Sequence, residues 1–388
     1  MMLKTSSFQV VIVCFLALLS NAVHAQHDDI EDISAARAAK LNAAFAELVA
    51  KHNINTAGVA VIKQQKVIWQ NQFGQQSSGV PATANTLFNI ASLTKTITAE
   101  TILRLVAQGK LSLDEPVAPY WLDPDLNGDP RVHQLTARML LSHTGGFMNW
   151  RYFADDGKLR FIDAPGNSFN YSGEGYEYLA KYAENKLGVP FPKLVQSTIF
   201  EPLSMSSAAI VVDKNNFANI AKPLDKDGKF YGFYCHPAGY CSKEGSYSAA
   251  ANLVITVADY ARFLISSMQG EGLSAALKQD RNTMQGIQFK QSEIICGDAP
   301  ASACPSQLGY GLGWSMAHLP NGNTIGHRGT NWSIVSLTYY YPDSGDGLIV
   351  FFNAPNKAGI AGMIDALELL DPDSPEIQGY KLRLARAQ

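Results

Sequence analysis

The sequence lacks the features that mark several large classes of protein. Its 388 residues contain no G-x-S-x-G segment, which argues against the nucleophile turn of an α/β-hydrolase. They also contain no internal repeat, no block of like charge and no low-complexity linker, and only 17% of them are charged. Because 46% are hydrophobic, the chain can bury a large core, and its length allows two subdomains. A disordered or fibrous protein is therefore excluded.

Long hydrophobic runs are also missing. The apolar stretch Val10 to Leu19 has ten residues, too few to span a bilayer. It follows Lys4 and precedes Val23-His24-Ala25, an ending that suits signal peptidase. We therefore predict that residues 1–25 are a cleaved signal peptide. The mature protein is expected in a bacterial periplasm or outside the cell, without stable membrane insertion.

Basic charge is scarce as well. The formal net charge is −3, and removal of Lys4 with the signal peptide makes it more negative. Nucleic acid and anionic membrane surfaces are therefore not expected as partners. The sequence points to a small-molecule or short peptide substrate and leaves protein partners unknown.

Cysteine is rare, and its distribution fits export. Once Cys14 is removed with the leader, an even set remains, which an oxidising compartment would pair. Local bridges are the simplest of three possible connectivities: Cys235 with Cys241, and Cys296 with Cys304. The alternative hypothesis is a zinc site that uses Cys235 and His236, but the spacing matches no C-x2-C pattern. We predict no metal site.

One Ser-x-x-Lys segment is present, at Ser92-Leu93-Thr94-Lys95. It lies where a strand-like run gives way to a helical run from Thr94 to Leu105. At this spacing on a helix the hydroxyl and the ammonium lie on the same face, so Lys95 can activate Ser92. Alone, the motif also fits an ordinary helical turn.

Two later segments supply the other groups that a lysine-assisted serine needs. Tyr171 lies in a Pro- and Gly-rich loop before a helical run from Tyr176 to Lys186, and its phenol could exchange a proton with Ser92. The run Thr324 to Trp332 is predicted as an edge strand bordering a cleft, where His327 presents a hydrogen-bonding group and Gly329 lets backbone approach substrate.

Each of these residues has a competitor. His143-Thr144-Gly145 is a second His-x-Gly, but it ends a helical run and its glycines suggest a helix C-cap. Tyr247-Ser248 repeats the Tyr-Ser pair of Tyr171-Ser172 without the Pro-Gly lead-in. We therefore favour His327 and Tyr171.

The element pattern predicts a mixed fold of class α/β (α+β). A helix is expected over Ile33 to Lys51, with strands over Thr56 to Ile62 and Lys66 to Gln70. Residues 113–249 are mainly helical, and strands return in the last third. We predict one catalytic domain over residues 26–388, in which an antiparallel sheet flanked by helices (residues 26–112 and 250–388) is interrupted by the helical insertion 113–249.

In this order and spacing, Ser92-x-x-Lys95, Tyr171-Ser172-Gly173 and His327-Arg328-Gly329 resemble the three motifs of the serine penicillin-recognising enzymes, the β-lactamase and transpeptidase-like family. The branch of class C β-lactamases, D,D-peptidases, D-aminopeptidases and esterases is most similar. The resemblance implies a β-lactamase-like fold, an acyl-enzyme on Ser92, and no metal or organic cofactor. Lys95 would be the electrostatic partner of Ser92, and Tyr171 the general base and acid. The backbone N–H groups of Ser92 and Thr330 would form the oxyanion hole.

Departures from the family pattern concern the substrate. Gly173 stands where the family usually has Asn, so Asn170 or Glu174 is considered as a replacement contact. Arg328 could grip a substrate carboxylate with its planar donor fork. We expect an exported serine hydrolase acting on a D-amino-acid peptide or cell-wall fragment. An esterase, a β-lactamase and a penicillin-binding or peptidoglycan-sensing module without turnover are the alternatives.

Overall fold

The computed structural model describes residues 34–235, 237 and 241–386. The predicted signal peptide lies outside these residues. From Asp32 onward the chain forms one compact unit. No helix among the described residues is long and apolar enough to cross a membrane.

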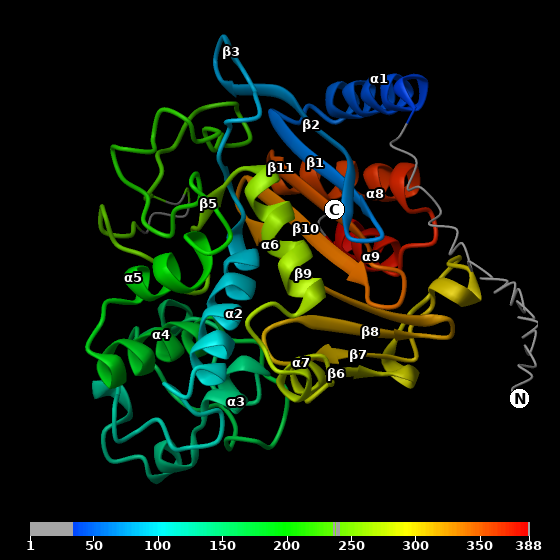
Figure 1. The fold of residues 1–388 in the computed structure, drawn as a ribbon. Helices are drawn as coiled ribbons and strands as arrows, with labels where there is room; N and C mark the ends of the chain where they lie inside the picture. Colours follow the sequence, from blue (N-terminus) through cyan, green and yellow to red (C-terminus); the bar gives the residue numbers. More distant parts are fainter. Residues whose placement is uncertain (1–33, 236, 238–240, 387–388) are drawn as a thin grey trace, which may run out of the picture. The chain divides into compact units, whose positions relative to one another are not determined.

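An antiparallel sheet in the order β3-β2-β1-β11-β10-β9-β8-β7-β6 forms the centre of this unit, as Figure 1 shows. The fold class predicted from the sequence is confirmed. The strands of the structure are β1 (Thr56–Lys63), β2 (Lys66–Ser77), β3 (Val80–Pro81), β4 (Phe88–Asn89), β5 (Val254–Ile255), β6 (Gly286–Lys290), β7 (Gln307–Tyr310), β8 (Ser315–Leu319), β9 (Gly322–Asn331), β10 (Ile334–Tyr341) and β11 (Asp346–Asn353).

Helices cover both faces of the sheet, and successive strand residues point to opposite faces. One core contains Ile349 and Phe351 with residues of α2 and α6, whereas the other contains Val350 and Phe352 with residues of α1 and α8. The helices are α1 (Ala35–Lys51), α2 (Thr94–Ala107), α3 (Ala137–Leu141), α4 (Gly173–Leu187), α5 (Phe191–Val195), α6 (Val257–Gln269), α7 (Ala275–Arg281), α8 (Asn356–Leu370) and α9 (Glu376–Arg386).

The prediction that Thr324 to Trp332 is an edge strand is wrong. β9 lies between β10 and β8, because three further strands continue the sheet beyond it. The register of β8 with β9 ends at the pair Ser315 and Gly326. Beyond Gly326, β9 therefore has a strand partner on its β10 side only, and this half of the strand packs against the turn that carries Ser92.

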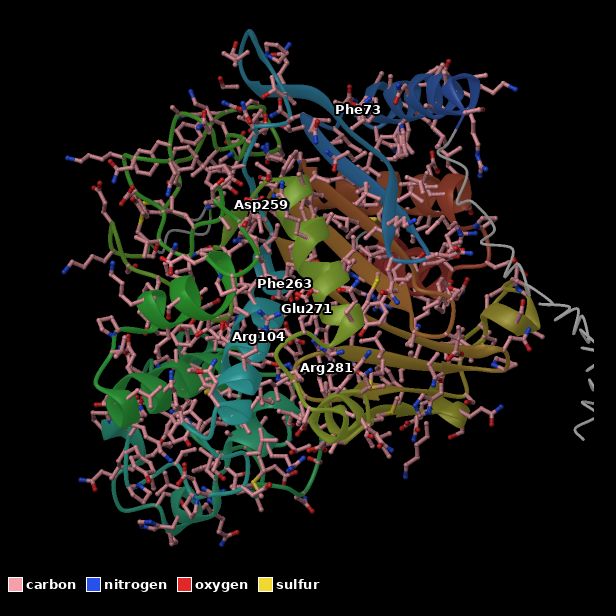
Figure 2. The ribbon with its side chains drawn as sticks, in the orientation of Figure 1. Phe73, Arg104, Asp259, Phe263, Glu271 and Arg281 are labelled. Carbon is pink, nitrogen blue, oxygen red and sulfur yellow. A yellow bond between two sulfur atoms is a disulfide. The ribbon has the colours of Figure 1, made fainter. Side chains whose placement is uncertain are left out.

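A buried ion pair anchors α2, the helix that follows Ser92. Arg281 of α7 donates to Glu100 of α2 at 2.6 Å, and both side chains are fully buried. The indole of Trp314 donates to the same Glu100 oxygen at 3.1 Å. Figure 2 shows Arg104 on α2 and Arg281 of α7 beside this helix. Removal of one partner of such a pair typically costs about 3–5 kcal/mol, because the other charge stays buried.

Both local disulfide predictions are confirmed. Cys235 bonds to Cys241 and Cys296 bonds to Cys304. A thiolate of Cys235 is therefore not available for the alternative zinc site, and His236 lies outside the described residues.

Candidate active site

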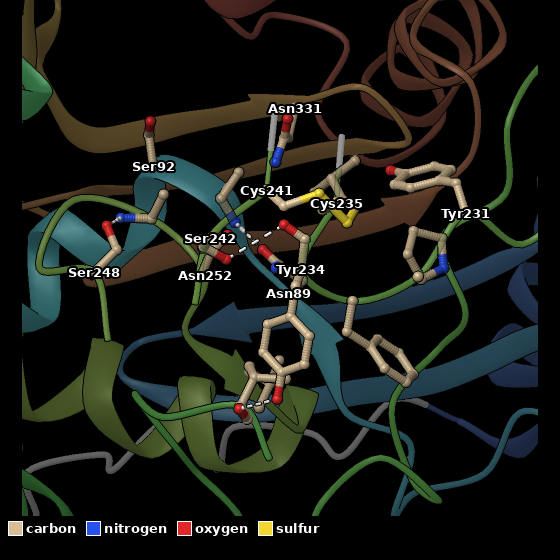
Figure 3. Close-up of a pocket in the computed structure, with 18 of the residues that line it drawn as sticks. Asn89, Ser92, Tyr231, Tyr234, Cys235, Cys241, Ser242, Ser248, Asn252 and Asn331 are labelled. Carbon is tan, nitrogen blue, oxygen red and sulfur yellow. Dashed lines mark hydrogen bonds between the residues drawn. A yellow bond between two sulfur atoms is a disulfide. The ribbon is translucent and has the colours of Figure 1, made fainter. Parts of the chain in front are cut away.

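Ser92 lies in a single turn of 3-10 helix, Ala91–Leu93, which leads directly into α2. The turn begins with a strained residue, because Ala91 has a left-handed φ of 47°. The side chain of Asn89 accepts a hydrogen bond from the Ala91 N–H at 2.9 Å and so stabilises this conformation. As a result the Ser92 side chain faces a cavity, as Figure 3 shows.

Lys95 is one helical turn further on and is completely buried. Its ammonium donates to Ser92 Oγ at 3.3 Å and to the carbonyl oxygen of Ala250 at 2.9 Å. The Ala250 carbonyl therefore holds Lys95 beside the serine. The Ser-x-x-Lys spacing in the sequence predicted this pair of side chains on one face of the helix.

Tyr171 comes from the loop before α4 and reaches the same place. Lys95 Nζ lies 5.0 Å from the centre of the Tyr171 ring, and also contacts the rings of Tyr176 and Trp150 at 5.6 and 5.7 Å. Three aromatic faces thus surround a buried cation, an arrangement that stabilises positive charge. The structure brings Ser92, Lys95 and Tyr171 together.

His143, which the sequence analysis ranked second, fixes the backbone on both sides of Tyr171. Its carbonyl oxygen accepts from the Asn170 N–H at 2.7 Å, and its Nδ1 accepts from the Ser172 N–H at 3.1 Å. Its ring centre lies 4.4 Å from that of Tyr171. Because Nδ1 accepts, the imidazole is neutral with its proton on Nε2. Burial, then the positive charge of Lys95, holds its pKa well below the usual value.

The predicted helix C-cap formed by the glycines near His143 is wrong. α3 ends at Leu141, and the residue with a left-handed φ, of 58°, is His143 itself. A positive φ on a residue other than glycine is uncommon and is often found at functional sites. Here it turns the chain so that one residue can contact both neighbours of Tyr171.

His327 is also buried and lies near Tyr171, with 6.4 Å between the ring centres. Its Nδ1 donates to the carbonyl oxygen of Arg328 at 2.7 Å, so Nε2 is the acceptor and faces the hydroxyl of Tyr310 at 3.4 Å. Burial, followed by the charge of Lys95, lowers the pKa of His327 to about 3. The imidazole is therefore neutral near pH 7. Tyr310, which sequence reasoning missed, joins the ring cluster of His143, Tyr171 and His327.

Gly329 allows β9 to approach the Ser92 turn. A Cβ atom at this position would lie 2.2 Å from Ser336 Oγ and 2.4 Å from the carbonyl oxygen of Ile90. The close contact is thus with the protein's own backbone, where the sequence analysis expected substrate. It places Thr330 and Ser92 on the same cavity, as an oxyanion hole from their two N–H groups requires.

Arg328 is directed away from this cavity. Its guanidinium forms an ion pair with Glu376 of α9 and lies 5.7 Å from the ring of Tyr380. Arg328 is not among the residues that line the cavity with Ser92, so its position does not support a role in binding a substrate carboxylate.

The two residues considered as replacements for the family's Asn occupy different places. Asn170 donates its side-chain amide to the carbonyl oxygen of Ser168 at 3.3 Å and does not line the cavity. Glu174 does line it, but accepts from the Arg151 guanidinium at 2.8 and 2.9 Å and from the Arg151 N–H at 3.0 Å. Arg151 also pairs with Asp123 at 2.8 Å.

Trp150 accounts for the glycine at position 173. A Cβ atom there would lie 2.3 Å from Trp150 Cζ2, so any larger residue would displace the indole. The ring lies beside Lys95 and lines the cavity. A tryptophan face therefore lies beside Lys95, next to the position where the family usually has an amide.

The cavity in front of Ser92 has a volume of about 490 Å³. Its far wall comes from the segment that holds the Cys235–Cys241 disulfide, and Figure 3 shows Ser92 at one side and Tyr231 at the other. Apolar and aromatic side chains from this and other segments also line the cavity: Val212, Ile220, Phe233, Tyr234 and Ile334. Within the described residues, no group of three or more His, Cys, Asp or Glu side chains could hold a metal ion.

Comparison with known proteins gives related sequences and a shared fold. A β-lactamase from Pseudomonas fluorescens is 31% identical over 193 residues, and esterase EstB from Burkholderia gladioli is 29% identical over 209 residues. These alignments cover 47% and 46% of this chain and 53% of each relative, so the chain spans about half the length of both. Penicillin-binding protein 4* from Bacillus subtilis is 25% identical over 342 residues, with 81% of this chain and 71% of the relative covered.

Solved structures show the same fold at lower identity. The octameric penicillin-binding protein homologue from Pyrococcus abyssi superposes with a TM-score of 0.68 and 24% identity, covering 87% of this chain and 78% of that chain. A class C β-lactamase superposes with a TM-score of 0.66 and 19% identity, covering 86% and 97% of the two chains. A family model described as Beta-lactamase matches residues 41–370, and this chain belongs to the β-lactamase family of serine hydrolases.

Proposed function

We propose that Ser92 is the nucleophile of an exported hydrolase that forms an acyl-enzyme with a small ester or amide. The observation that carries this proposal is the buried Lys95 ammonium, which donates to Ser92 Oγ at 3.3 Å and lies 5.0 Å from the Tyr171 ring. A serine hydroxyl, a cation and a phenol gathered at one place can supply a nucleophile, a charge that activates it and a proton acceptor.

In the proposed mechanism Tyr171 acts as the general base. Its phenol oxygen takes the Ser92 proton as Oγ attacks the acyl carbon. The negative charge on the acyl oxygen is stabilised by the N–H groups of Ser92 and Thr330. Tyr171 then returns the proton to the leaving group, and a water molecule repeats the sequence to release the acid.

The substrate proposed from the sequence is a D-amino-acid peptide or related cell-wall fragment. A D-aminopeptidase from Gluconobacter oxydans is 27% identical over 199 residues, which supports this choice. An ester with an uncharged apolar acyl group is the second candidate. The apolar wall supports it, and Arg151, the cation among the described lining residues, is already paired with Glu174 and Asp123.

Export to an oxidising compartment is part of the proposal. The two disulfides support it, because such bonds persist outside the reducing cytosol.

The test is the mass of the intact protein over time after addition of p-nitrophenyl butyrate, D-alanine p-nitroanilide or benzylpenicillin. The wild type should gain one acyl group with at least one of them, and Ser92→Ala should gain none. Ser344→Ala, which removes an exposed hydroxyl in the turn between β10 and β11, should behave as the wild type. A short-lived adduct with product release indicates turnover, whereas a lasting adduct indicates a binding module. An adduct that persists in Ser92→Ala would refute the assignment.

A further inference from the structure

Glu177 of α4 is a half-buried carboxylate that lines the cavity and takes no part in the proposed mechanism. Its oxygens accept hydrogen bonds from the hydroxyl of Ser248, from the Ala249 N–H at 3.2 Å and from the Ala250 N–H at 3.3 Å. One side chain therefore holds three consecutive residues of another segment. Such a concentration of bonds on one carboxylate fixes the orientation of the peptide groups around it.

The held segment is the one that positions Lys95. The carbonyl oxygen of Ala250 accepts from Lys95 Nζ at 2.9 Å, the shorter of the two hydrogen bonds of that ammonium. Thr98, on the same helix as Lys95, donates to the carbonyl oxygen of Ala249 at 2.7 Å. The turn from Ser248 to Ala250 is therefore clamped between Glu177 on one side and the catalytic helix on the other.

Charge supports the same connection. Lys95 is completely buried, and within the described residues no carboxylate lies within ion-pairing distance of it. The cavity's other lining carboxylate, Glu174, is occupied by Arg151. Burial raises the pKa of Glu177, and the positive charge of Lys95 across the turn acts in the opposite direction, so the carboxylate and the buried ammonium stabilise each other.

We infer that Glu177 is a positioning residue of the acylation step. It holds the Ser248–Ala250 turn so that the Ala250 carbonyl keeps Lys95 on Ser92. This inference rests on the proposed function of Ser92. It predicts that loss of the carboxylate slows attack by Ser92 without weakening substrate binding.

The test measures the rate at which a fluorophosphonate probe labels Ser92, together with kcat and KM on the best substrate of the panel above. Glu177→Gln keeps the volume but places an NH₂ group against a backbone N–H. It should lower the labelling rate and kcat about 10- to 100-fold, as expected for a disturbed hydrogen bond to a charged group, with KM within about twofold. Glu184→Gln is the matched control, because Glu184 lies on the same helix and accepts from the Phe191 N–H away from Lys95.

Ser248→Ala provides a second variant that removes only a hydroxyl. Because it acts on the same turn, it should also slow labelling, and the double variant with Glu177→Gln should lose less than the product of the two single effects. Unchanged labelling in Glu177→Gln, or an equal loss in Glu184→Gln, would overturn the inference. If the wild type itself were not labelled at Ser92, the proposed function would fail instead, so the two failures are distinguishable.

Discussion

His327 should make the stability of this protein depend on pH in a defined direction. Its imidazole is 1% exposed, and burial and the nearby Lys95 lower its pKa from 6.5 to about 3. The unfolded chain takes up a proton at this histidine near pH 6.5, whereas the folded chain does so only near pH 3. Between these values the unfolded state binds more protons, so the free energy of unfolding falls as the pH is lowered.

The size of the effect follows from the two pKa values. At pH 7 this group costs the folded state about 0.2 kcal/mol, and at pH 5 it costs about 2 kcal/mol. Acidification between these two values should therefore remove about 2 kcal/mol of stability through His327 alone.

Urea denaturation of the wild type and of His327→Gln at pH 7 and pH 5 measures this contribution. Glutamine keeps a donor and an acceptor but does not titrate in this range. Other titrating groups, such as His143, are common to both proteins, so the pH-dependent loss should be about 2 kcal/mol smaller in the variant. Equal losses would show that the imidazole is not held neutral by its surroundings.

Substitutions at three further residues, Tyr171, His143 and Gly173, test the site. Tyr171→Phe should slow acylation about 100-fold or more in rapid-quench experiments, and a near-normal rate would assign the base to another group. His143→Ala removes the acceptor for the Ser172 N–H and should lower kcat about 10-fold. His143→Asn keeps an acceptor and tolerates the left-handed φ, so it should retain more activity. If His143→Asn were less active than His143→Ala, this positioning role would be excluded. Gly173→Asn should destabilise the protein by about 1–3 kcal/mol in thermal unfolding because it collides with Trp150, and Trp150→Ala should relieve the loss. No relief would exclude the steric explanation.

Hydrophobic periodicity predicted the longer elements well. The expected helix over Ile33 to Lys51 is observed as Ala35–Lys51, and the expected strand Thr56 to Ile62 is observed as Thr56–Lys63. These segments bury one face or lie wholly in the core, so their apolar pattern follows the geometry of the element.

The strands β6, β7 and β8 escaped prediction for a physical reason. β6 has one buried residue followed by four exposed ones, and its pairing with β7 shifts register between Ile287 and Phe289. β7 and β8 each bury two neighbouring residues instead of alternate ones, so none of these short strands leaves an alternating pattern in the sequence. Because these strands were missed, β9 was placed at the edge of the sheet.

Contacts between distant segments could not be predicted from the sequence either. Trp150 packs over Gly173, which is 23 positions away in the sequence. Glu177 accepts a hydrogen bond from Ser248, which is 71 positions away. Neither pair has a spacing that a single helix or strand imposes. The sequence could show that an amide was missing at position 173, but it could not show which side chain fills the space.

The position of Arg328, in contrast, could have been derived from the sequence. In a strand, neighbouring side chains point to opposite faces. If His327 faces Tyr171, then Arg328 must face away and Gly329 must face the Ser92 turn, as the structure has them. The same alternation sends the side chain of Thr330 toward α9, where its hydroxyl accepts from Arg383 at 2.7 Å. The backbone N–H of Thr330 is then the only group of this residue that can donate to the acyl oxygen. The alternation that points Arg328 away from the cavity is therefore the same alternation that an oxyanion hole in this strand requires.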